Sequence, residues 1–313
     1  MRITVISGGE PGARFTRGLL DHLEHHPDLG GAEVTVIANT GDDISLWGLR
    51  LCPDLDLLVE ALGTAGGAGS SHVVGDELAA LGLEPQWYPV SDREMGVHVA
   101  RTAWLGRGDS LSQVTAHLAR TRGVPDTVRI LPMSDVPVET HVVLDGPEDQ
   151  RAVHVQQWRR ELASPGAARF VVAGLDRAHP GTEVLDAVRS ADVVLLPPSD
   201  PVLALGIVLG VPGVRDALRG TSAPVVGVSP VVDDVPAPQP LAASLATVGV
   251  VTSGGVAGLF KDLLDGWVVD PADAGAAPAG SRWATAAHTA PLAESAPADV
   301  AATALAHALS LRS

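Results

Sequence analysis

Short runs of β-branched and aliphatic residues alternate along the chain with segments whose apolar residues recur at helical spacing. The runs predict strands at Ile3–Ser7, Val34–Ala38, Val128–Leu131, Thr140–Leu144, Arg169–Ala173, Val193–Leu196 and Pro224–Val228. The helical spacing predicts helices at Ala13–Leu23, Leu55–Leu62, Thr182–Arg189, Ala204–Leu209 and Ala298–Leu311. This alternation, with near-continuous apolar strands, is typical of a parallel sheet covered on both faces. We therefore predict an α/β fold built on a Rossmann-like, doubly wound, mostly parallel sheet.

A different pattern lies between the second and third predicted strands. From about residue 75 to residue 125 the apolar residues keep helical spacing, and the segments Asp76–Leu83, Asp92–Leu105 and Leu111–Arg122 each predict a helix. We interpret this region as a helical insertion that caps one end of the sheet, within a single domain spanning residues 1–313.

Composition narrows the kinds of partner. The 313 residues are 46% hydrophobic and carry a formal net charge of −16, so the surface does not favour nucleic acid, and aromatic residues make up only 3%. Cys52 is the sole cysteine, which excludes an intrachain disulfide. No stretch approaches the roughly 20 apolar residues of a membrane helix, and the first apolar run is too short for a signal peptide. We expect a cytoplasmic protein that binds neither nucleic acid nor membrane.

Four carboxylates follow the second predicted strand, those of Asp42, Asp43, Asp54 and Asp56. The carboxyl end of a strand is where open α/β sheets bind ligands, and close carboxylates are often gathered around a metal. Asp54 and Asp56 have a simpler interpretation as charges that favour the start of the following helix. That interpretation does not account for Asp42 and Asp43, and Mg²⁺ needs only one or two carboxylates.

A glycine-rich turn follows the first predicted strand and contains Gly8, Gly9, Gly12 and, at the start of the next helix, Arg14. Glycines let a backbone approach a phosphate, and a helix N-terminus offers free N–H donors. An ordinary tight turn explains the same residues, because their spacing matches neither the Rossmann nor the P-loop fingerprint.

A second turn, Pro197-Pro198-Ser199-Asp200-Pro201, follows the strand Val193–Leu196. Ser199 and Asp200 are candidate contacts to a nucleotide or phosphate at a switch point of the sheet. Either residue also suits the N-cap of the helix that follows.

These segments resemble, in this order, the 2-phospho-L-lactate transferase family of coenzyme F-420 biosynthesis over most of the chain, up to about Val269. The resemblance rests on a colinear set of short motifs: Gly8-Gly9, Gly12-Ala13-Arg14-Phe15, Asn39, Gly41-Asp42-Asp43, Gly48-Leu49-Arg50, Cys52-Pro53-Asp54-Leu55-Asp56, Asp92-Arg93, His98, Leu111-Ser112-Gln113, Leu131-Pro132-Met133-Ser134-Asp135, Glu139-Thr140-His141-Val142, His154-Val155-Gln156-Gln157-Trp158, Pro198-Ser199, Pro201 and Val228-Ser229-Pro230.

The resemblance implies a Mg²⁺-dependent transfer of a phospho-lactyl or phospho-enolpyruvyl group. The donor would be a guanosine diphosphate conjugate, the acceptor the ribityl hydroxyl of the deazaflavin Fo, and the leaving group GMP. It also implies a homodimer. On the matching positions, Asp42 and Asp54 would hold Mg²⁺ and Asp43 is the candidate acceptor of the hydroxyl proton. The candidate substrate-binding residues are Gly8, Gly9, Gly12, Arg14, Asp92, Thr140, His141, Ser199 and Asp200.

Three positions depart from the family pattern and make the expected phosphate site more acidic. Glu10 and Pro11 stand in the glycine turn, Asp200 replaces an asparagine, and the segment after Ser229-Pro230 carries no cation. They leave two alternatives open: a donor bound in another way, or a divergent paralogue of altered activity. They also keep open a non-catalytic regulator that binds nucleotide sugars, as in the related gluconeogenesis factors. A nicotinamide dehydrogenase ranks last, because the glycine spacing does not fit.

Overall fold

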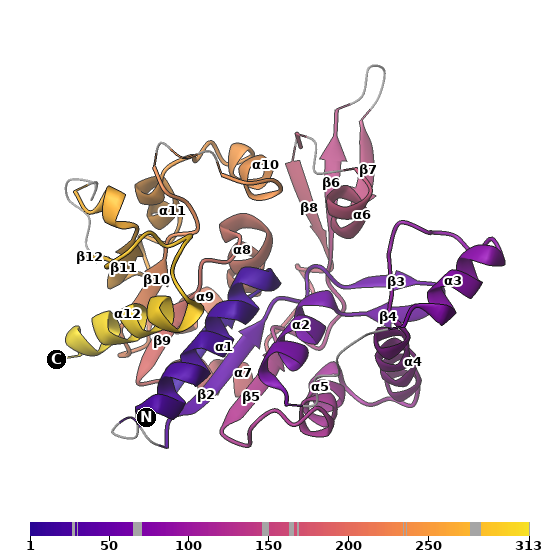
Figure 1. The fold of residues 1–313 in the computed structure, drawn as a ribbon, viewed down its shortest axis with the longest axis horizontal. Coiled ribbons are helices and arrows are strands. Elements are labelled where there is room, and N and C mark those ends of the chain that lie inside the picture. The colour runs from indigo at the N-terminus through magenta and orange to yellow at the C-terminus, as the bar shows by residue number, and fades with distance from the viewer. Residues whose placement is uncertain are drawn as a thin grey trace.

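The structure, a computed structural model, describes residues 1–26, 29, 31–64, 71–145, 150–162, 166–167, 169–233, 235, 237–275 and 283–312. Seven parallel strands form the central sheet in the order β12-β11-β10-β9-β1-β2-β5. They are β1 (Arg2–Ser7), β2 (Glu33–Ala38), β5 (Val128–Pro132), β9 (Val193–Leu196), β10 (Val225–Val228), β11 (Gly266–Val269) and β12 (Ala284–Ala287). This confirms the predicted doubly wound sheet (Figure 1).

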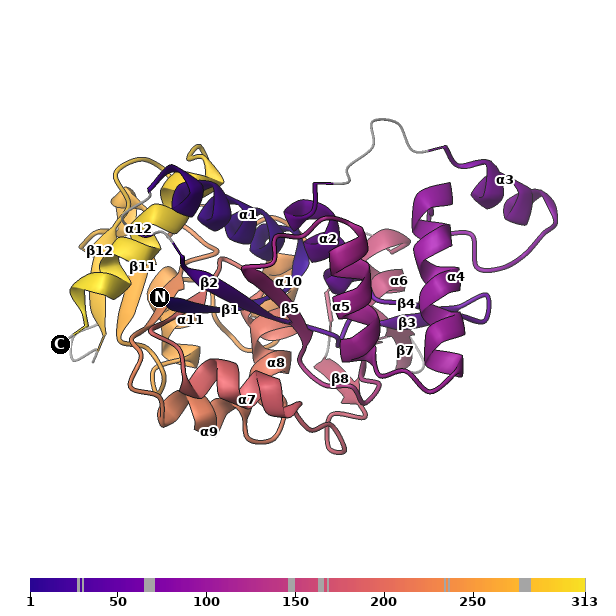
Figure 2. The same ribbon diagram turned by 90° about the horizontal axis from the view of Figure 1, so that it is seen from below.

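Helices cover both faces of this sheet, as the views in Figures 1 and 2 show. One face carries α1 (Gly9–His25), α2 (Pro53–Leu62), α5 (Leu111–Thr121) and α12 (Pro297–Ser310). The other carries α7 (Thr182–Arg189), α8 (Gly206–Gly210), α9 (Val214–Arg219) and α11 (Ser253–Leu259). Side chains alternate between the two cores along β1, with Ile3 and Val5 on the first face and Ile6 on the second. No helix in the described part of the chain is long and apolar enough to cross a membrane.

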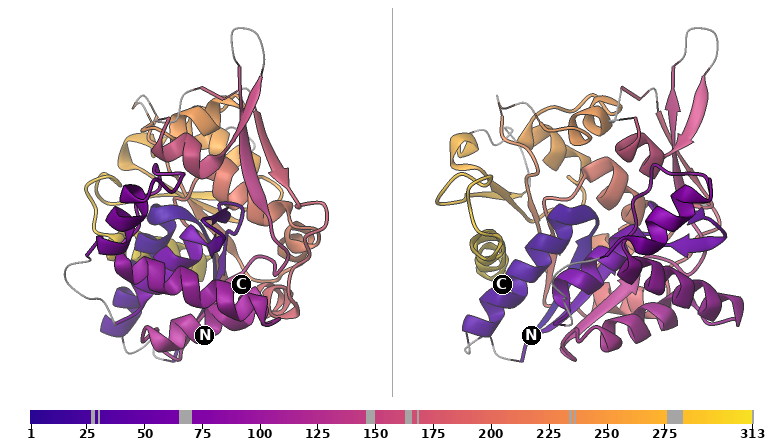
Figure 3. Two further views of the ribbon diagram at one scale, coloured as in Figure 1. Left: turned by 90° about the vertical axis from the view of Figure 1, so that its right-hand side faces the viewer. Right: turned by 45° about the vertical axis from the view of Figure 1, so that its right-hand side comes forward.

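In the described part of the chain, two smaller sheets lie outside the parallel one. In the first, β6 (Glu139–Leu144) pairs antiparallel with both β7 (Arg151–His154) and β8 (Arg169–Ala173). Figure 3 shows these pink strands projecting beyond the helices, and α6 (Val155–Arg160) follows β7. The predicted strands at 140–144 and 169–173 thus exist, but their expected place in the parallel alternation is wrong. The second is a hairpin of β3 (Ile44–Leu46) and β4 (Leu49–Leu51).

The helical region between β4 and β5 contains α3 (Val73–Ala80), α4 (Asp92–Gly106) and α5. Two capping boxes begin the longer helices: Ser91 and Glu94 cap α4, and Ser110 and Gln113 cap α5. Helix α4 packs against β4 and α3, whereas α5 packs against β5 and α2 at the edge of the main sheet. The region therefore extends the molecule beyond the β2–β5 end of the sheet (Figure 2).

Helices α1 and α12 cross at Gly18, where the backbones meet. A Cβ at Gly18 would lie 2.3 Å from the Pro297 carbonyl carbon and 2.5 Å from the Ala298 nitrogen. Because these atoms belong to the backbone, Gly18→Ala should lower the free energy of unfolding by about 2 kcal/mol. Urea denaturation measures this free energy. Gly96→Ala is the control, since a Cβ at that helical glycine would have no neighbouring atom within 4 Å. Equal stabilities would contradict the close crossing.

Candidate active site at the carboxyl edge of the sheet

A cavity of about 810 Å³ opens at the carboxyl edge of the parallel sheet. It lies beside the switch point, where β1 leads on to β2 and the neighbouring β9 leads on to β10 in the opposite direction. This is the place where doubly wound sheets bind their ligands. The lining comes from the turn after β1, from α2 and α6, from the turns after β9 and β10, and from residues between β12 and α12. Its polar and glycine residues include Gly8, Gly9, Glu10, Arg14, Asp42, Asp54, Gln156, Arg159, Arg160, Asp200 and Ser229.

Two carboxylates meet at one end of the cavity. The amide nitrogen of Asn39 lies 2.9 Å from Asp54 Oδ2 and 3.4 Å from Asp42 Oδ1, so one side chain links both acids. The Asn39 oxygen in turn accepts the N–H of Gly41 at 2.9 Å, which orients the amide. The turn after β2 supplies Asp42, and the first turn of α2 supplies Asp54. The structure therefore places these two acids side by side at the Asn39 amide, and their role as metal ligands stays a prediction.

The environment of the pair suits a divalent cation. Burial, followed by the neighbouring Asp42 carboxylate, raises the pKa of Asp54 to about 7, although the Asn39 amide and the Arg159 guanidinium oppose the shift. Among the described residues, no group of three or more His, Cys, Asp and Glu side chains is arranged to hold a metal ion. Mg²⁺, however, commonly takes one or two carboxylates and completes its shell with water and substrate phosphate. Asp42 and Asp54 fit that requirement.

Helix α6 brings cations to the same cavity. The Arg159 guanidinium forms an ion pair with Asp42, and the Gln156 amide lies 3.3 Å from Asp42 Oδ2. Burial lowers the pKa of Arg159, but the carboxylates of Asp42, Asp200 and Asp54 outweigh it and raise that pKa above its ordinary value. Arg160 lines the cavity as well, with its guanidinium carbon 4.3 Å from the centre of the Tyr88 ring.

The glycine turn after β1 lines the same cavity. A Cβ at Gly8 would lie 2.7 Å from Ala204 and 2.9 Å from Asp54 Oδ2, so only glycine lets the turn approach the acid pair. The 17-residue helix α1 begins beside the cavity, which its residues Gly9 and Arg14 line, and a helix N-terminus favours anions. Gly12 lies behind them, against the hydroxyls of Ser7 and Ser199.

The turn after β9 serves mainly to hold the local backbone. Asp200 Oδ1 accepts the N–H groups of Val202 at 2.8 Å and Leu203 at 2.9 Å and so caps the π-helical turn Pro201–Leu205. Its Oδ2 accepts the Ser244 hydroxyl of α10 (Leu241–Ala246) at 2.7 Å. Asp200 lines the cavity, and both of its carboxylate oxygens accept hydrogen bonds from the protein. The hydroxyl oxygen of the fully buried Ser199 accepts the Gly8 N–H at 3.4 Å. The helix-cap interpretation of Asp200 is confirmed.

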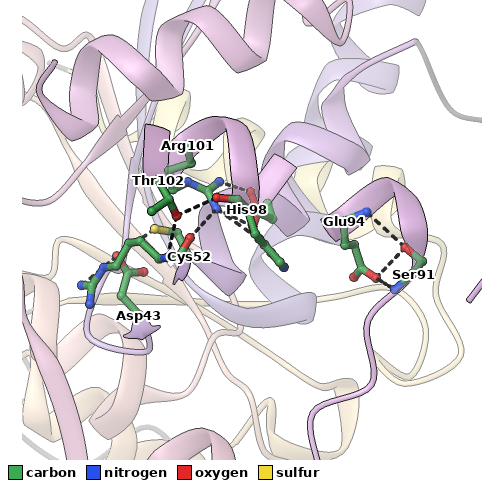
Figure 4. A network of polar contacts seen from close by, with 9 residues as sticks. Asp43, Cys52, Ser91, Glu94, His98, Arg101 and Thr102 are labelled. Carbon is green, nitrogen blue, oxygen red and sulfur yellow. Dashed lines mark hydrogen bonds and ion pairs between the residues drawn. The ribbon is translucent and has the colours of Figure 1, made fainter. Parts of the chain in front are cut away.

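Asp43 faces away from Asp42, into a separate polar cluster. Its carboxylate contacts Arg50 at 3.3 Å and accepts the Cys52 thiol at 3.0 Å (Figure 4). Burial raises its pKa to about 7 although Arg50 opposes the shift. Asp43 is not among the residues that line the cavity. Its role as acceptor of the hydroxyl proton stays a prediction.

The remaining predicted substrate contacts also lie outside the cavity lining. The Thr140 hydroxyl is buried without a hydrogen-bond partner, and its N–H donates to Gly41 O at 2.7 Å. The His141 ring packs edge-on against His154, with 5.5 Å between ring centres. Asp92, the first residue of α4, accepts the Val74 N–H at 2.8 Å and the Ser71 hydroxyl at 2.6 Å, and so links the start of α4 to the start of α3. The structure therefore brings together Gly8, Gly9, Arg14, Asp42, Asp54 and Asp200 around the cavity, but not Asp43, Asp92, Thr140 or His141.

Three residues at the acid pair received no role from the sequence: Asn39, Gln156 and Arg159. Asn39 and Gln156 stand inside the short motifs of the family resemblance, which is the signal that marks them. Arg159 lies outside those motifs, and more than a hundred residues separate it from Asp42. Only the fold brings them into contact.

Comparisons with known proteins point to one family. The model of the family described as 2-phospho-L-lactate transferase CofD matches residues 3–295. A phosphoenolpyruvate transferase of Thermobifida fusca is 46% identical over 292 residues, which cover 90% of this chain and 89% of that protein. A phosphoenolpyruvate transferase of Streptomyces griseus is 45% identical over 286 residues, which cover 88% of this chain and 87% of that protein.

A likeness to a solved structure concerns the fold alone. A member of the UPF0052 family from Bacillus halodurans superposes with a TM-score of 0.55 at 19% identity, over 86% of this chain and 80% of that one. The sequence matches decide the family and confirm the resemblance found in the short motifs. The chain belongs to the 2-phospho-L-lactate transferase CofD family.

Proposed function

We propose that this protein transfers a phospho-enolpyruvyl group from a guanosine diphosphate conjugate to the ribityl hydroxyl of the deazaflavin Fo, a step of coenzyme F-420 biosynthesis. The observation that carries the proposal is the Asp42–Asp54 pair, linked by Asn39 at the switch-point cavity. The hydroxyl oxygen would form a bond to the phosphorus next to the enolpyruvyl group. The bridging P–O bond to GMP would break, and the hydroxyl would lose its proton.

The residues of the cavity match the charges of such a donor. Asp42 and Asp54 would hold Mg²⁺, which neutralises the diphosphate and so stabilises the negative charge on the leaving GMP. The N-terminus of α1, together with Arg14, Arg159 and Arg160, would hold the phosphate oxygens. The positive charge of these arginines offsets the negative charge that the departures from the family pattern add at Glu10 and Asp200. A donor bound through α6 therefore needs no lysine after Ser229-Pro230.

The acyl group follows from the relatives. Those described above are phosphoenolpyruvate transferases, and they cover nearly all of this chain at 45% identity or more. We therefore favour the enolpyruvyl donor over the lactyl one. The same relatives favour a transferase over the non-catalytic regulator that the sequence left open.

The proposal is tested by incubating the purified protein with Fo, enolpyruvyl-diphosphoguanosine and Mg²⁺. We expect GMP and a phosphorylated deazaflavin to appear in equal amounts, as chromatography with deazaflavin absorbance would show. Chelation by EDTA should stop the reaction, and added Mg²⁺ should restore it. The lactyl donor, run in parallel, should react more slowly. Donor binding without release of GMP, at micromolar enzyme, would refute the transfer and favour the regulator.

A further inference from the structure

Arg159 forms an ion pair with Asp42, whose carboxylate is a metal ligand in the proposed function. The guanidinium meets Asp42 Oδ2, while Asp42 Oδ1 faces the Asn39 amide. We infer that Arg159 is a stand-in cation: it holds Asp42 in the metal-free protein, leaves when a divalent cation arrives, and then pairs with the diphosphate of the donor. This inference rests on the metal pair of the proposed function and concerns a positioning residue of that site.

Charge and burial explain why a stand-in is needed. The residues Asp42 and Asp54 are 1% and 4% exposed and lie on one amide, so their like charges are poorly screened. A buried carboxylate without a partner strongly destabilises a protein. Arg159 therefore stabilises the free enzyme. A divalent cation held by Asp42 and Asp54 would make that pairing redundant and would repel the guanidinium.

The position of Arg159 allows the exchange. It lies in the last turn of the six-residue helix α6, its side chain is 23% exposed, and it lines the cavity. A guanidinium that leaves Asp42 thus enters the space where a diphosphate would lie. Arginine suits both partners, since its fork of N–H groups matches carboxylate and phosphate oxygens alike.

Arg160 offers a matched comparison on the same helix. It lines the same cavity, but its Nε donates to Gln156 Oε1 at 3.0 Å and its guanidinium lies over the Tyr88 ring. Both arginines carry one positive charge at a similar place. They differ in that Arg159 is paired with a proposed metal ligand. If only the lost positive charge mattered, Arg159→Gln and Arg160→Gln would change the affinity for the metal equally. If Arg159 exchanges with the metal, the two variants would differ in that affinity.

The exchange couples the metal to the donor. Arg159 competes with the metal for Asp42 in the free protein, so it weakens metal binding there. Once a diphosphate takes up the guanidinium, that competition ends and the metal binds more tightly. By reciprocity, the metal strengthens binding of the diphosphate by the same factor. The enzyme would thus fill both sites together.

The test measures binding of Mn²⁺ to the full chain, by electron paramagnetic resonance of the free ion, with and without GDP. Without nucleotide, Arg159→Gln should bind Mn²⁺ about tenfold more tightly than Arg160→Gln does. With GDP, wild-type protein should gain Mn²⁺ affinity by a larger factor than Arg159→Gln. Thermal unfolding gives a second readout, since Mn²⁺ should raise the Tm of Arg159→Gln more than that of Arg160→Gln.

Each opposite result overturns the inference. If Arg159→Gln binds Mn²⁺ no better than Arg160→Gln, or if no variant binds Mn²⁺ at millimolar concentration, Arg159 is not a stand-in cation. These outcomes are separate from the transfer assay. Transfer with equal Mn²⁺ affinities would leave the proposed function intact and reject the exchange. Tighter Mn²⁺ binding without any transfer would do the reverse.

Discussion

Replacing Asp54 by asparagine is expected to lower the rate of transfer at least 100-fold, or about 3 kcal/mol of transition-state stabilisation, without lowering the stability of the free protein. Asparagine is a poor ligand for Mg²⁺, so the diphosphate would lose its counter-charge. Its side-chain oxygen still accepts the Asn39 amide that Asp54 accepts at 2.9 Å. The neutral amide also removes the repulsion from Asp42 that contributes to the raised pKa of Asp54.

The combination of lost activity and kept stability identifies a functional residue, because sites built for binding often retain unfavourable charges. Steady-state kinetics with the enolpyruvyl donor measure the first quantity, and urea denaturation at pH 8 without metal measures the second. Glu60→Gln is the control, since it makes the same change at an exposed position of the same helix and should stay near wild type in both. An Asp54→Asn enzyme that keeps more than a tenth of its activity would contradict the metal role.

The sequence predicts the parallel sheet well because its strands carry a strong local signal. Val193–Leu196 is buried at every position in β9, as expected for a strand covered on both faces. A β-branched run does not tell which sheet it joins, however, and so Arg169–Ala173 was placed in the wrong one. Its alternating burial in β8 is the mark of a sheet with one solvated face. The strands β11 and β12 escaped prediction altogether.

Some residues of the candidate site could likewise be predicted from the sequence, and others could not. Asp42 and Asp54 are close in sequence and follow a strand, so their meeting could be predicted from spacing and family resemblance. A carboxylate at a helix start serves equally as a cap or as a contact. Asp200 accepts the N–H groups of Val202 and Leu203 and so is a cap, while its contact with a substrate stays a prediction. Arg159 could not be predicted, since a contact across the fold has no local pattern.

The largest expected loss of stability comes from Arg101→Met. Arg101 (Figure 4) is 1% exposed on α4. Its guanidinium forms an ion pair with Asp56 on α2, the helix that carries Asp54. The Arg101 Nη1 atom lies 3.1 Å from Asp56 Oδ2, and His98 Nδ1 lies 3.7 Å from the same oxygen. Burial is the main cause that lowers the pKa of His98, so we do not expect its imidazole to replace the lost charge in full. Methionine would therefore leave Asp56 without a cation and cost about 3 kcal/mol of unfolding free energy.

Urea denaturation of four variants, Arg101→Met, Asp56→Asn, the double variant and Arg107→Met, separates this cause from a simple loss of packing. Arg107→Met removes an exposed ion pair, with side chains 67% and 44% accessible at Arg107 and Asp109, and should cost less than about 0.5 kcal/mol. Adding Asp56→Asn to Arg101→Met should recover part of the stability, because the unpaired carboxylate is then gone. If the double variant is as unstable as the two single changes added together, the contact between α4 and α2 depends on the volume of Arg101 rather than on its charge.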